Sequence, residues 1–401
     1  MSDYLTARFF GTGGVIKEVP EDFLVEEIPL YSPCGEGEHL YVEVEKQGLT
    51  TFDLLNRLAR VLGVRERELG YAGLKDARAT TRQTVSIPGV KPDQVFGLEL
   101  EGVRILSARF HRNKLRPGHL AGNRFTIRIR QVREGSLDEA RDVLHVLQNV
   151  GVPNRFGAQR YGSLGNSHHI GGALLRRNFE EAARQIVGDP SMITNERWRI
   201  GAERFAAGDL EGALSALPAR YRDERKMIQA LIEGRSAREA VLGMPRKLLR
   251  LYLSAYQSQL FDRVVTMRLA TLDILWAGDM AWKHDNGACF FVEDPASEQP
   301  RADRLEISPS GPLFGYKTTL ARGQAGLLEE SLLDREKLRL EDFRLEGGLG
   351  MEGERRPLRV PLGGVDVTAD GGDLVLAFSL PKGSYATSVL REVMKTEPAC
   401  A

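Results

Sequence analysis

The chain has 401 residues, of which 42% are hydrophobic and 27% charged, so it is long enough for two domains or one elaborated core and too apolar for general disorder. Its 55 basic and 55 acidic residues cancel, and the net charge therefore gives no argument for nucleic-acid binding. The sequence has no leader-like start, no membrane-spanning apolar run and no cysteine cluster, so we expect a cytoplasmic protein without a membrane anchor or a disulfide framework.

The first third of the sequence is typical of a mixed α/β structure. Apolar and polar residues alternate at four places and predict short strands there: residues 14–25, 39–44, 71–73 and 83–87. A helix is predicted over residues 52–62, because its apolar residues keep helical spacing and Thr50 and Asp53 can form a capping box at its start. The polar segment 74–82 between the last two strands places Asp76 on a strand-to-strand loop.

A further strand and a further helix are predicted next. Residues 124–130 alternate strictly, so apolar side chains share one face and basic side chains the other: Phe125, Ile127 and Ile129 against Arg124, Arg128 and Arg130. Such a strand presents basic groups outward over a core. A helix is predicted over residues 137–149, with Ser136 and Glu139 as its capping box.

The composition changes near residue 154. Five helical patterns, joined by glycine, proline and aspartate turns, follow from there: residues 179–186, 195–206, 210–216, 221–233 and 246–267. Two strands and a helix are predicted near the end of the chain, over residues 358–360, 373–380 and 387–395. We therefore expect an α+β fold in which residues 1–153 and 350–401 form a discontinuous core and residues 154–349 form a large, mostly α-helical insertion domain.

The charges cancel overall but are unevenly distributed. Nine lysines or arginines and no acid lie between residues 104 and 133: Arg104, Arg109, Arg112, Lys114, Arg116, Arg124, Arg128, Arg130 and Arg133. A basic stripe of this kind can follow a phosphate backbone, with counterion release driving the affinity. Taken alone, a solvated basic surface is the more common explanation.

Asp76 lies in a segment rich in cations, with Lys75, Arg78 and Arg82 around it. Nearby cations favour the ionised form that a carboxylate nucleophile needs. By itself this pattern is weak, because an aspartate in a turn between strands more often caps a backbone amide or forms a surface ion pair.

The segment Gly-Leu-Lys-Asp-Ala-Arg-Ala-Thr-Thr-Arg-Gln at residues 73–83 resembles the catalytic-loop signature of the TruD family of pseudouridine synthases. Other segments resemble the same family in order along nearly the whole chain: residues 17–26, 35–39, 122–125, 154–162, 256–261, 311–315 and 378–387. Their joint order makes the resemblance specific, and it implies that Asp76 is the catalytic nucleophile. It also implies a pseudouridine-synthase-like fold, with a mixed, mainly antiparallel sheet and flanking helices.

The activity implied by the resemblance is the isomerisation of uridine to pseudouridine in tRNA, at position 13. Enzymes of this kind detach uracil from its ribose, rotate it and rejoin it through carbon, and they need no metal, nucleotide or organic cofactor. The aspartate either attacks C1′ of the sugar or assists a glycal route, and the sequence does not decide between the two. The target base has to leave its stack, so the pocket needs a flat side chain.

By the same resemblance, Phe125 stacks on the flipped base, and Asn123 reads the polar edge of uracil or orients Asp76. Alternation alone assigns Phe125 to the core instead. Three further substrate-binding residues are implied: Lys17, Phe23 and Phe378. The alternatives are a solvated strand-edge lysine and core packing of the two phenylalanines.

Four more basic residues are RNA-binding candidates: Lys75, Arg155, Arg160 and Arg391. His168 and His169 have no acidic or cysteine partners at ligand spacing, so no metal site is expected. The expected partner is tRNA, and the protein is expected to be a monomer. The alternative function is a non-catalytic RNA-binding or tRNA-folding protein that keeps the pocket only as a docking site.

Overall fold

The structure is a computed structural model that describes residues 3–77 and 79–396. The described chain divides into two compact units. The first contains residues 3–152, without Arg78, and residues 360–396, while the second contains residues 153–359. Both ends of the described chain, near residues 3 and 396, thus belong to the first unit.

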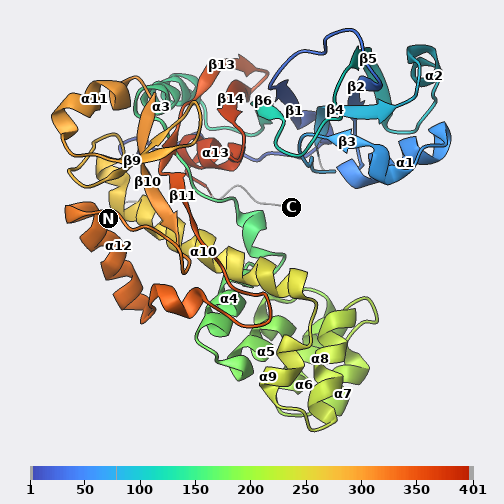
Figure 1. The fold of residues 1–401 in the computed structure, drawn as a ribbon, viewed down its shortest axis with the longest axis vertical. Helices are drawn as coiled ribbons and strands as arrows, with labels where there is room; N and C mark the ends of the chain where they lie inside the picture. The colour runs from blue at the N-terminus through green and yellow to red at the C-terminus, as the bar shows by residue number, and fades with distance from the viewer. Residues whose placement is uncertain (1–2, 78, 397–401) are drawn as a thin grey trace. The chain divides into compact units, whose positions relative to one another are not determined.

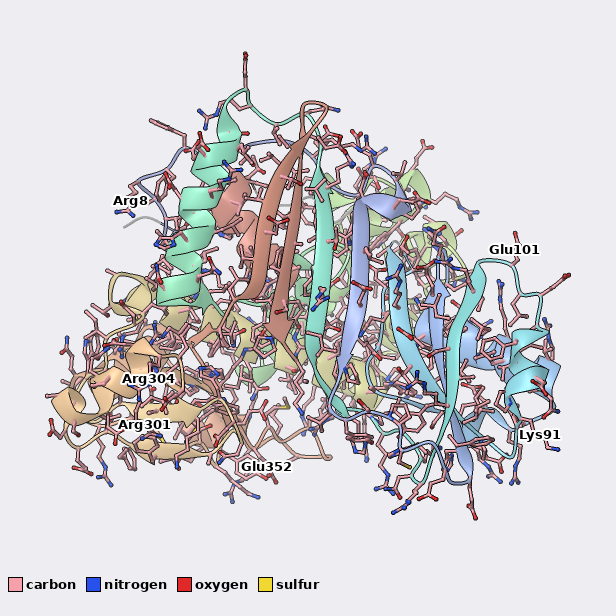
Figure 2. All side chains as sticks on the ribbon, turned by 90° about the horizontal axis from the view of Figure 1, so that it is seen from above. Arg8, Lys91, Glu101, Arg301, Arg304 and Glu352 are labelled. Atoms are coloured by element: carbon pink, nitrogen blue, oxygen red, sulfur yellow. The ribbon has the colours of Figure 1, made fainter. Side chains whose placement is uncertain are left out.

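The first unit is built on an eight-stranded mixed sheet with the order β13-β14-β6-β1-β4-β2-β5, in which β3 also pairs with β4. Figures 1 and 2 show these strands side by side. Only β1 and β4 run parallel among these described strands, so the expected mainly antiparallel α+β fold is confirmed. The strands are β1 (Phe23–Pro29), β2 (His39–Lys46), β3 (Gly70–Tyr71), β4 (Thr80–Pro88), β5 (Val103–His111), β6 (Leu120–Ile129), β13 (Gly363–Asp370) and β14 (Asp373–Pro381).

Two hydrophobic cores lie on the same face of this sheet. On β4, Thr81 pairs with Val25 of β1, and Val85 pairs with Val42 of β2. Side chains alternate along a strand, so Thr81 and Val85 lie on the same face of β4, and the two valines lie on that face as well. One core packs β1, β6 and β14 against helices, and the other packs β2 and β4 against a helix. The helices of this unit are α1 (Thr51–Leu62), α2 (Pro92–Phe96), α3 (Ser136–Val150) and α13 (Ala386–Met394).

Helix α1 follows the sequence prediction closely. The Thr50 side chain accepts a hydrogen bond from the Asp53 N–H, and the Asp53 carboxylate accepts one from the Thr50 N–H, which completes the predicted capping box. Gly63 ends the helix in the left-handed conformation, with φ of 68°. The caps place the first turn of α1 at a fixed position beside β4.

Two local predictions were wrong. The strand predicted over residues 14–25 begins only at Phe23, because the preceding residues form an isolated bridge at Val15 and a short 3-10 helix, η1 (Pro20–Asp22). Helix α3 begins after Gly135 and has no capping box, since Ser136 already lies inside it. The Glu139 carboxylate instead accepts hydrogen bonds from the backbone N–H groups of the N-terminal segment.

The second unit contains the predicted helices and several more that the sequence patterns did not indicate. Its helices are α4 (Ser167–Leu175), α5 (Phe179–Val187), α6 (Glu196–Ala206), α7 (Leu210–Ala216), α8 (Arg222–Ile232), α9 (Ala237–Leu242), α10 (Arg246–Arg268), α11 (Pro295–Asp303) and α12 (Gly323–Glu336). The five predicted segments correspond to α5, α6, α7, α8 and α10.

The second unit also holds a four-stranded sheet, which the sequence patterns missed. Its order is β11-β10-β8-β9, from β8 (Met280–Lys283), β9 (Cys289–Phe291), β10 (Ile307–Leu313) and β11 (Glu354–Pro357). Two short strands, β7 (Val152–Pro153) and β12 (Arg359–Val360), lie where the chain passes between the units. Within the described residues, none of the helices combines the length and the apolar character needed to cross a membrane.

Candidate active site

Asp76 lies in the loop between β3 and β4, as predicted, and the alanines that flank it, Ala72 and Ala79, are buried in two different hydrophobic clusters. Ala72 packs near the β2 side of the sheet, whereas Ala79 belongs to the core formed by β1, β6 and β14. The Lys75 N–H donates to the Thr51 hydroxyl at 2.8 Å, which ties the loop to the first turn of α1. A loop held at both ends and in its middle presents Asp76 in one place.

The residue that holds the Asp76 backbone was not indicated by the sequence. Lys46, at the end of β2, is 1% exposed, and its ammonium group donates to the carbonyl oxygens of Leu49 and Asp76, the latter at 3.3 Å. Burial lowers the pKa of Lys46 to about 8, although the nearby Asp76 charge acts in the opposite direction. The buried ammonium group of Lys46 thus holds the loop backbone in place at Asp76.

Lys75, the neighbour of Asp76, is also held in place. Its ammonium group lies 2.8 Å from Glu27 Oε1, and the two side chains are 7% and 5% exposed. The other Glu27 oxygen accepts a hydrogen bond from the Thr84 N–H on β4. Lys75 therefore points into the protein, where its charge is paired and is not presented to an RNA backbone.

The Asp76 side chain is 49% exposed and forms an ion pair with Lys17, whose Nζ lies 3.5 Å from Asp76 Oδ2. The Lys17 ammonium also lies 4.6 Å from the centre of the Phe23 ring. Lys17 lies on an irregular segment and not on a strand, and its φ of 60° is unusual for a lysine. This conformation directs its ammonium group to both Asp76 and Phe23.

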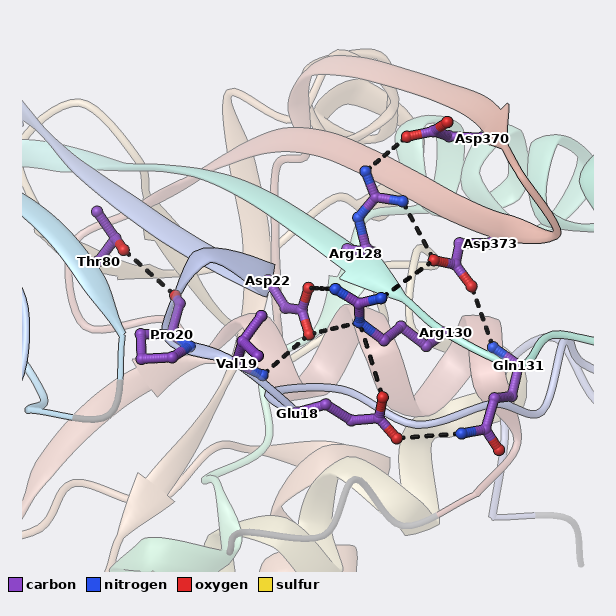
Figure 3. A network of polar contacts seen from close by, with 10 residues as sticks. All are labelled: Glu18, Val19, Pro20, Asp22, Thr80, Arg128, Arg130, Gln131, Asp370 and Asp373. Atoms are coloured by element: carbon purple, nitrogen blue, oxygen red, sulfur yellow. Dashed lines mark hydrogen bonds and ion pairs between the residues drawn. The ribbon is translucent and has the colours of Figure 1, made fainter.

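A polar network holds the segment that follows Lys17 (Figure 3). Arg130, the residue that follows β6, pairs with Asp22, whose side chain is 2% exposed, and its guanidinium also lies 3.8 Å from Glu18 and 3.7 Å from Asp373. Burial alone raises the pKa of Asp22, but the hydrogen bonds from Arg130 and from the Val19 N–H outweigh it and hold this pKa below its usual value. The network therefore keeps the Asp22 carboxylate ionised, and its ion pair with Arg130 fixes η1.

Three predicted aromatic residues form one row on three adjacent strands. The rings of Phe23 and Phe125 are 6.3 Å apart at an angle of 73°, and those of Phe125 and Phe378 are 5.4 Å apart at 31°. Phe378 is fully buried, whereas Phe23 and Phe125 are 7% and 6% exposed. Phe125 is therefore the middle ring of the row, between Phe23 and Phe378, and Phe23 is the ring that lies beside the Lys17 ammonium group.

Asn123 lies two residues before Phe125 on β6, opposite Glu27 of β1 and Leu380 of β14. Its Oδ1 is buried and has no hydrogen-bond partner among the described residues. The backbone beside it is packed so closely that a Cβ at Gly122 would lie 2.2 Å from the Leu380 carbonyl oxygen. A buried acceptor without a donor is what a pocket for a polar ligand edge requires.

Comparison with known proteins identifies the family. The family model of tRNA pseudouridine synthase D (TruD) matches residues 1–393. The chain belongs to the TruD family. Relatives that match it over nearly their whole length are named tRNA pseudouridine synthase D, which is the name of an isomerase.

Relatives within the TruD family match the chain along its whole length. The tRNA pseudouridine synthase D of Syntrophotalea carbinolica is 61% identical over 397 residues, which cover 99% of this chain and 100% of that protein. The Geobacter sulfurreducens protein of the same name is 56% identical over 98% of this chain and 97% of its own. A crystal structure of a TruD protein from Methanosarcina mazei has a TM-score of 0.84 at 30% identity and covers 98% of this chain and 96% of that one.

Three further basic candidates are engaged within this TruD protein. Arg155 donates to the Thr266 hydroxyl at 2.8 Å, and Arg160 donates to the Ser258 hydroxyl at 3.0 Å, so both bind α10 in the second unit. Arg391 of α13 lies 5.2 Å above the Tyr4 ring. In residues 3–77 and 79–396, no group of three or more His, Cys, Asp or Glu side chains is placed to hold a metal ion.

Proposed function

We propose that Asp76 is the group with which this tRNA pseudouridine synthase acts on the ribose of a flipped uridine, at position 13 of tRNA. The observation that carries the proposal is the ion pair between Asp76 and Lys17. It keeps a negative charge on a half-exposed carboxylate beside the aromatic row, where a sugar carrying a stacked base has to lie.

The pocket assignment follows from the surrounding contacts. Phe125, supported by Phe378, supplies the flat face for the uracil, and Phe23 closes the row beside Lys17. The unpartnered Oδ1 of Asn123 suits the N3–H donor of uracil, and its amide NH2 suits a carbonyl oxygen of the same edge. The polar edge of uracil and the Asn123 amide are therefore complementary, because each donor faces an acceptor.

The reaction balances without an external reagent. The bond between N1 and C1′ breaks, C5 forms the new bond to C1′, C5 loses its proton and N1 gains one. An ionised Asp76 supports either direct attack on C1′ or stabilisation of the positive charge that develops on a glycal route. Both routes need the carboxylate held beside the sugar, which the contacts from Lys46 and Thr51 to the loop provide.

The remaining assignments belong to the same proposal. The predicted catalytic core is residues 1–153 and 350–401, and the predicted insertion domain is residues 154–349. The compact units divide after residues 152 and 359 instead, so residues 350–359 belong with the second unit. Arg155 and Arg160 of this unit are assigned to the surface that meets RNA. The protein works in the cytoplasm as a monomer, with tRNA as its partner and without a metal or an organic cofactor.

The test compares the wild-type protein with the Asp76→Asn variant on a tRNA transcript that carries tritium at C5 of uridine. Wild-type protein releases tritium, because C5 exchanges its hydrogen for the bond to ribose, and a transcript with cytidine at position 13 releases none. Asp76→Asn binds the transcript but releases no tritium. Turnover by Asp76→Asn removes Asp76 from the mechanism, whereas binding without turnover by both proteins favours a non-catalytic RNA-binding protein.

A further inference from the structure

The loop of residues 112–119, between β5 and β6, separates two hollows on the surface of the first unit. One hollow, of about 890 Å3, is lined by Phe52 and Tyr71 together with several basic side chains, among them Arg67. The other, of about 540 Å3, is lined by Tyr31, two histidines and an asparagine. Lys114 and Arg116 line both hollows, so the loop forms a ridge with cations on either side.

This ridge retains the charge that most of the basic stripe loses. Five of the nine stripe residues, including Arg112 at the start of the ridge, are neutralised by acids that lie outside the stripe: Arg104 by Glu45, Arg112 by Glu36, Arg128 by Asp370 and Asp373, Arg130 by Asp22, and Arg133 by Glu139. Arg67 and Arg116 are exposed, and their side chains form no ion pair within residues 3–77 and 79–396. Glu66 is the one acid that lines the larger hollow.

Lys114 fixes the ridge to its neighbour. Its ammonium group donates to the Arg67 carbonyl at 2.7 Å, which holds the two basic segments together. The Leu115 N–H donates to the Ser86 hydroxyl of β4, and Leu115 itself is buried. The cations of Arg67, in a short 3-10 helix (Glu66–Glu68), and of Arg116, in the loop, therefore project from a rigid base.

Aromatic side chains accompany these cations. Phe52 is 47% exposed, and its ring meets Tyr71 edge to face at 5.9 Å. Tyr31 stacks on His111 at 5.1 Å and binds His119 through its hydroxyl. Cations with exposed rings are the combination that binds unpaired RNA, since phosphates meet the charges and bases meet the rings.

The ridge is also joined directly to the catalytic loop. The Gly118 N–H donates to the Ala72 carbonyl at 2.8 Å, four residues before Asp76. Thr51, which binds the Lys75 N–H, is the direct neighbour of the exposed Phe52. A chain of nucleotides that leaves the Asp76 site on this side therefore meets the ridge next.

We propose that this surface holds the unpaired RNA next to the target uridine, with Arg67 and Arg116 on backbone phosphates and Phe52 on a neighbouring base. The proposal rests on the proposed function, because it takes the bound RNA to be the substrate. It adds a binding surface outside the uracil pocket. Charge complementarity selects its occupant, since an exposed, unneutralised cationic ridge beside an RNA-modifying site fits a polyanion.

The test measures binding of an unmodified tRNA transcript to the full chain in the inactive Asp76→Asn background. The test variant adds Arg67→Glu and Arg116→Glu, and the control variant adds Lys91→Glu, which reverses an exposed cation beside α2 that lines neither hollow. Affinity is titrated at several salt concentrations. Thermal midpoints show that all three proteins are folded.

The two reversals should weaken binding by on the order of tenfold each, and each lost phosphate contact should lower the slope of log affinity against log salt by about 0.7 to 0.9. Lys91→Glu should leave both quantities unchanged. Unchanged affinity in the double reversal, an equal loss in the Lys91→Glu control, or no tRNA binding by the Asp76→Asn protein overturns the proposal. Failure of the proposed function is seen separately, as absent tritium release by the wild-type protein.

Discussion

The guanidinium of Arg130 binds the carboxylate of Asp22 through two hydrogen bonds, of 2.8 Å from Nε and 2.7 Å from Nη2. The backbone of Arg130 also exchanges two hydrogen bonds with Val15. One residue thus fixes the chain on both sides of Lys17, whose left-handed backbone is otherwise unfavourable. The clamp explains how Lys17 reaches Asp76 from an irregular segment.

Asp22→Asn should lower the free energy of unfolding by about 2 kcal/mol at neutral pH, the range for a hydrogen bond to a charged group. The folded-state pKa of Asp22 lies below its usual value, so this contribution is present above pH about 4 and is lost as pH falls through the folded-state pKa. The deficit of the variant, measured by urea unfolding, should therefore shrink in acid. Asp370→Asn, at a 61% exposed partner of Arg128, is the control and should cost less than about 1 kcal/mol.

Lys17→Met should lower kcat by roughly 10- to 100-fold, because it removes the ammonium group that orients the Asp76 carboxylate, and a misplacement of a reacting group by about 1 Å can cost about 100-fold. Steady-state kinetics on tRNA should show little change in KM, since the ammonium faces Asp76 and the Phe23 ring. Lys17→Arg keeps the charge and should restore part of kcat. Equal losses in both variants at unchanged thermal midpoints would mean that the shape of Lys17, and not its charge, matters.

Much of this arrangement was predictable because it depends on local patterns. The capping residues predicted helix α1, and the alternation of apolar and polar residues predicted the two faces of β6, including Phe125 on the buried face. Phe125 lies in the core, as alternation alone predicts, with 6% of its surface exposed, whereas its stacking on a flipped base stays a prediction.

The unpredicted features all depend on partners that are distant in sequence. The acids that neutralise the basic stripe come from other strands, so the stripe looked more charged in sequence than it is in the fold. Glu139 fits a capping box by spacing, yet the N-terminal segment supplies its donors. Lys46 carried no signal, because a lysine at the end of an alternating strand is usually exposed.

Phe125→Leu and Phe378→Leu form a matched pair that separates the pocket from the core. Both keep an apolar side chain, so each should cost roughly 1.5 kcal/mol of stability or less. Phe125→Leu loses the flat face, and stacking is worth about 1–3 kcal/mol per base, so its kcat/KM should fall at least several-fold. Phe378→Leu should retain most activity, because Phe378 is fully buried. Equal activity of the two variants would assign Phe125 to the core alone.

Lys46→Met should show its effect most clearly at high pH. The pKa of Lys46 is about 8 when folded and near its ordinary value of 10.5 when unfolded, so the unfolded chain binds more protons between these values and wild-type stability gains with rising pH there. The gain amounts to about 3 kcal/mol, since each pKa unit is worth about 1.36 kcal/mol. Urea unfolding of both proteins at pH 7.5 and 10 gives the difference in their unfolding free energies at each pH. Alkaline effects that the two proteins share cancel in this difference. A stability difference that stays constant with pH would show that the folded protein does not hold Lys46 near pKa 8.

The buried pair of Glu27 and Lys75 is best tested by a double-mutant cycle of Glu27→Gln and Lys75→Met. Each single change leaves one charge buried without its partner, which costs about 3–5 kcal/mol, whereas the double change removes both charges and should recover much of the loss. Activity should behave differently from stability. Lys75 fixes the backbone beside Asp76, so the double variant should unfold nearly like the wild type and yet turn over tRNA more slowly. If the double variant recovers kcat together with stability, the ion pair serves the fold and the Thr51 contact alone places the loop.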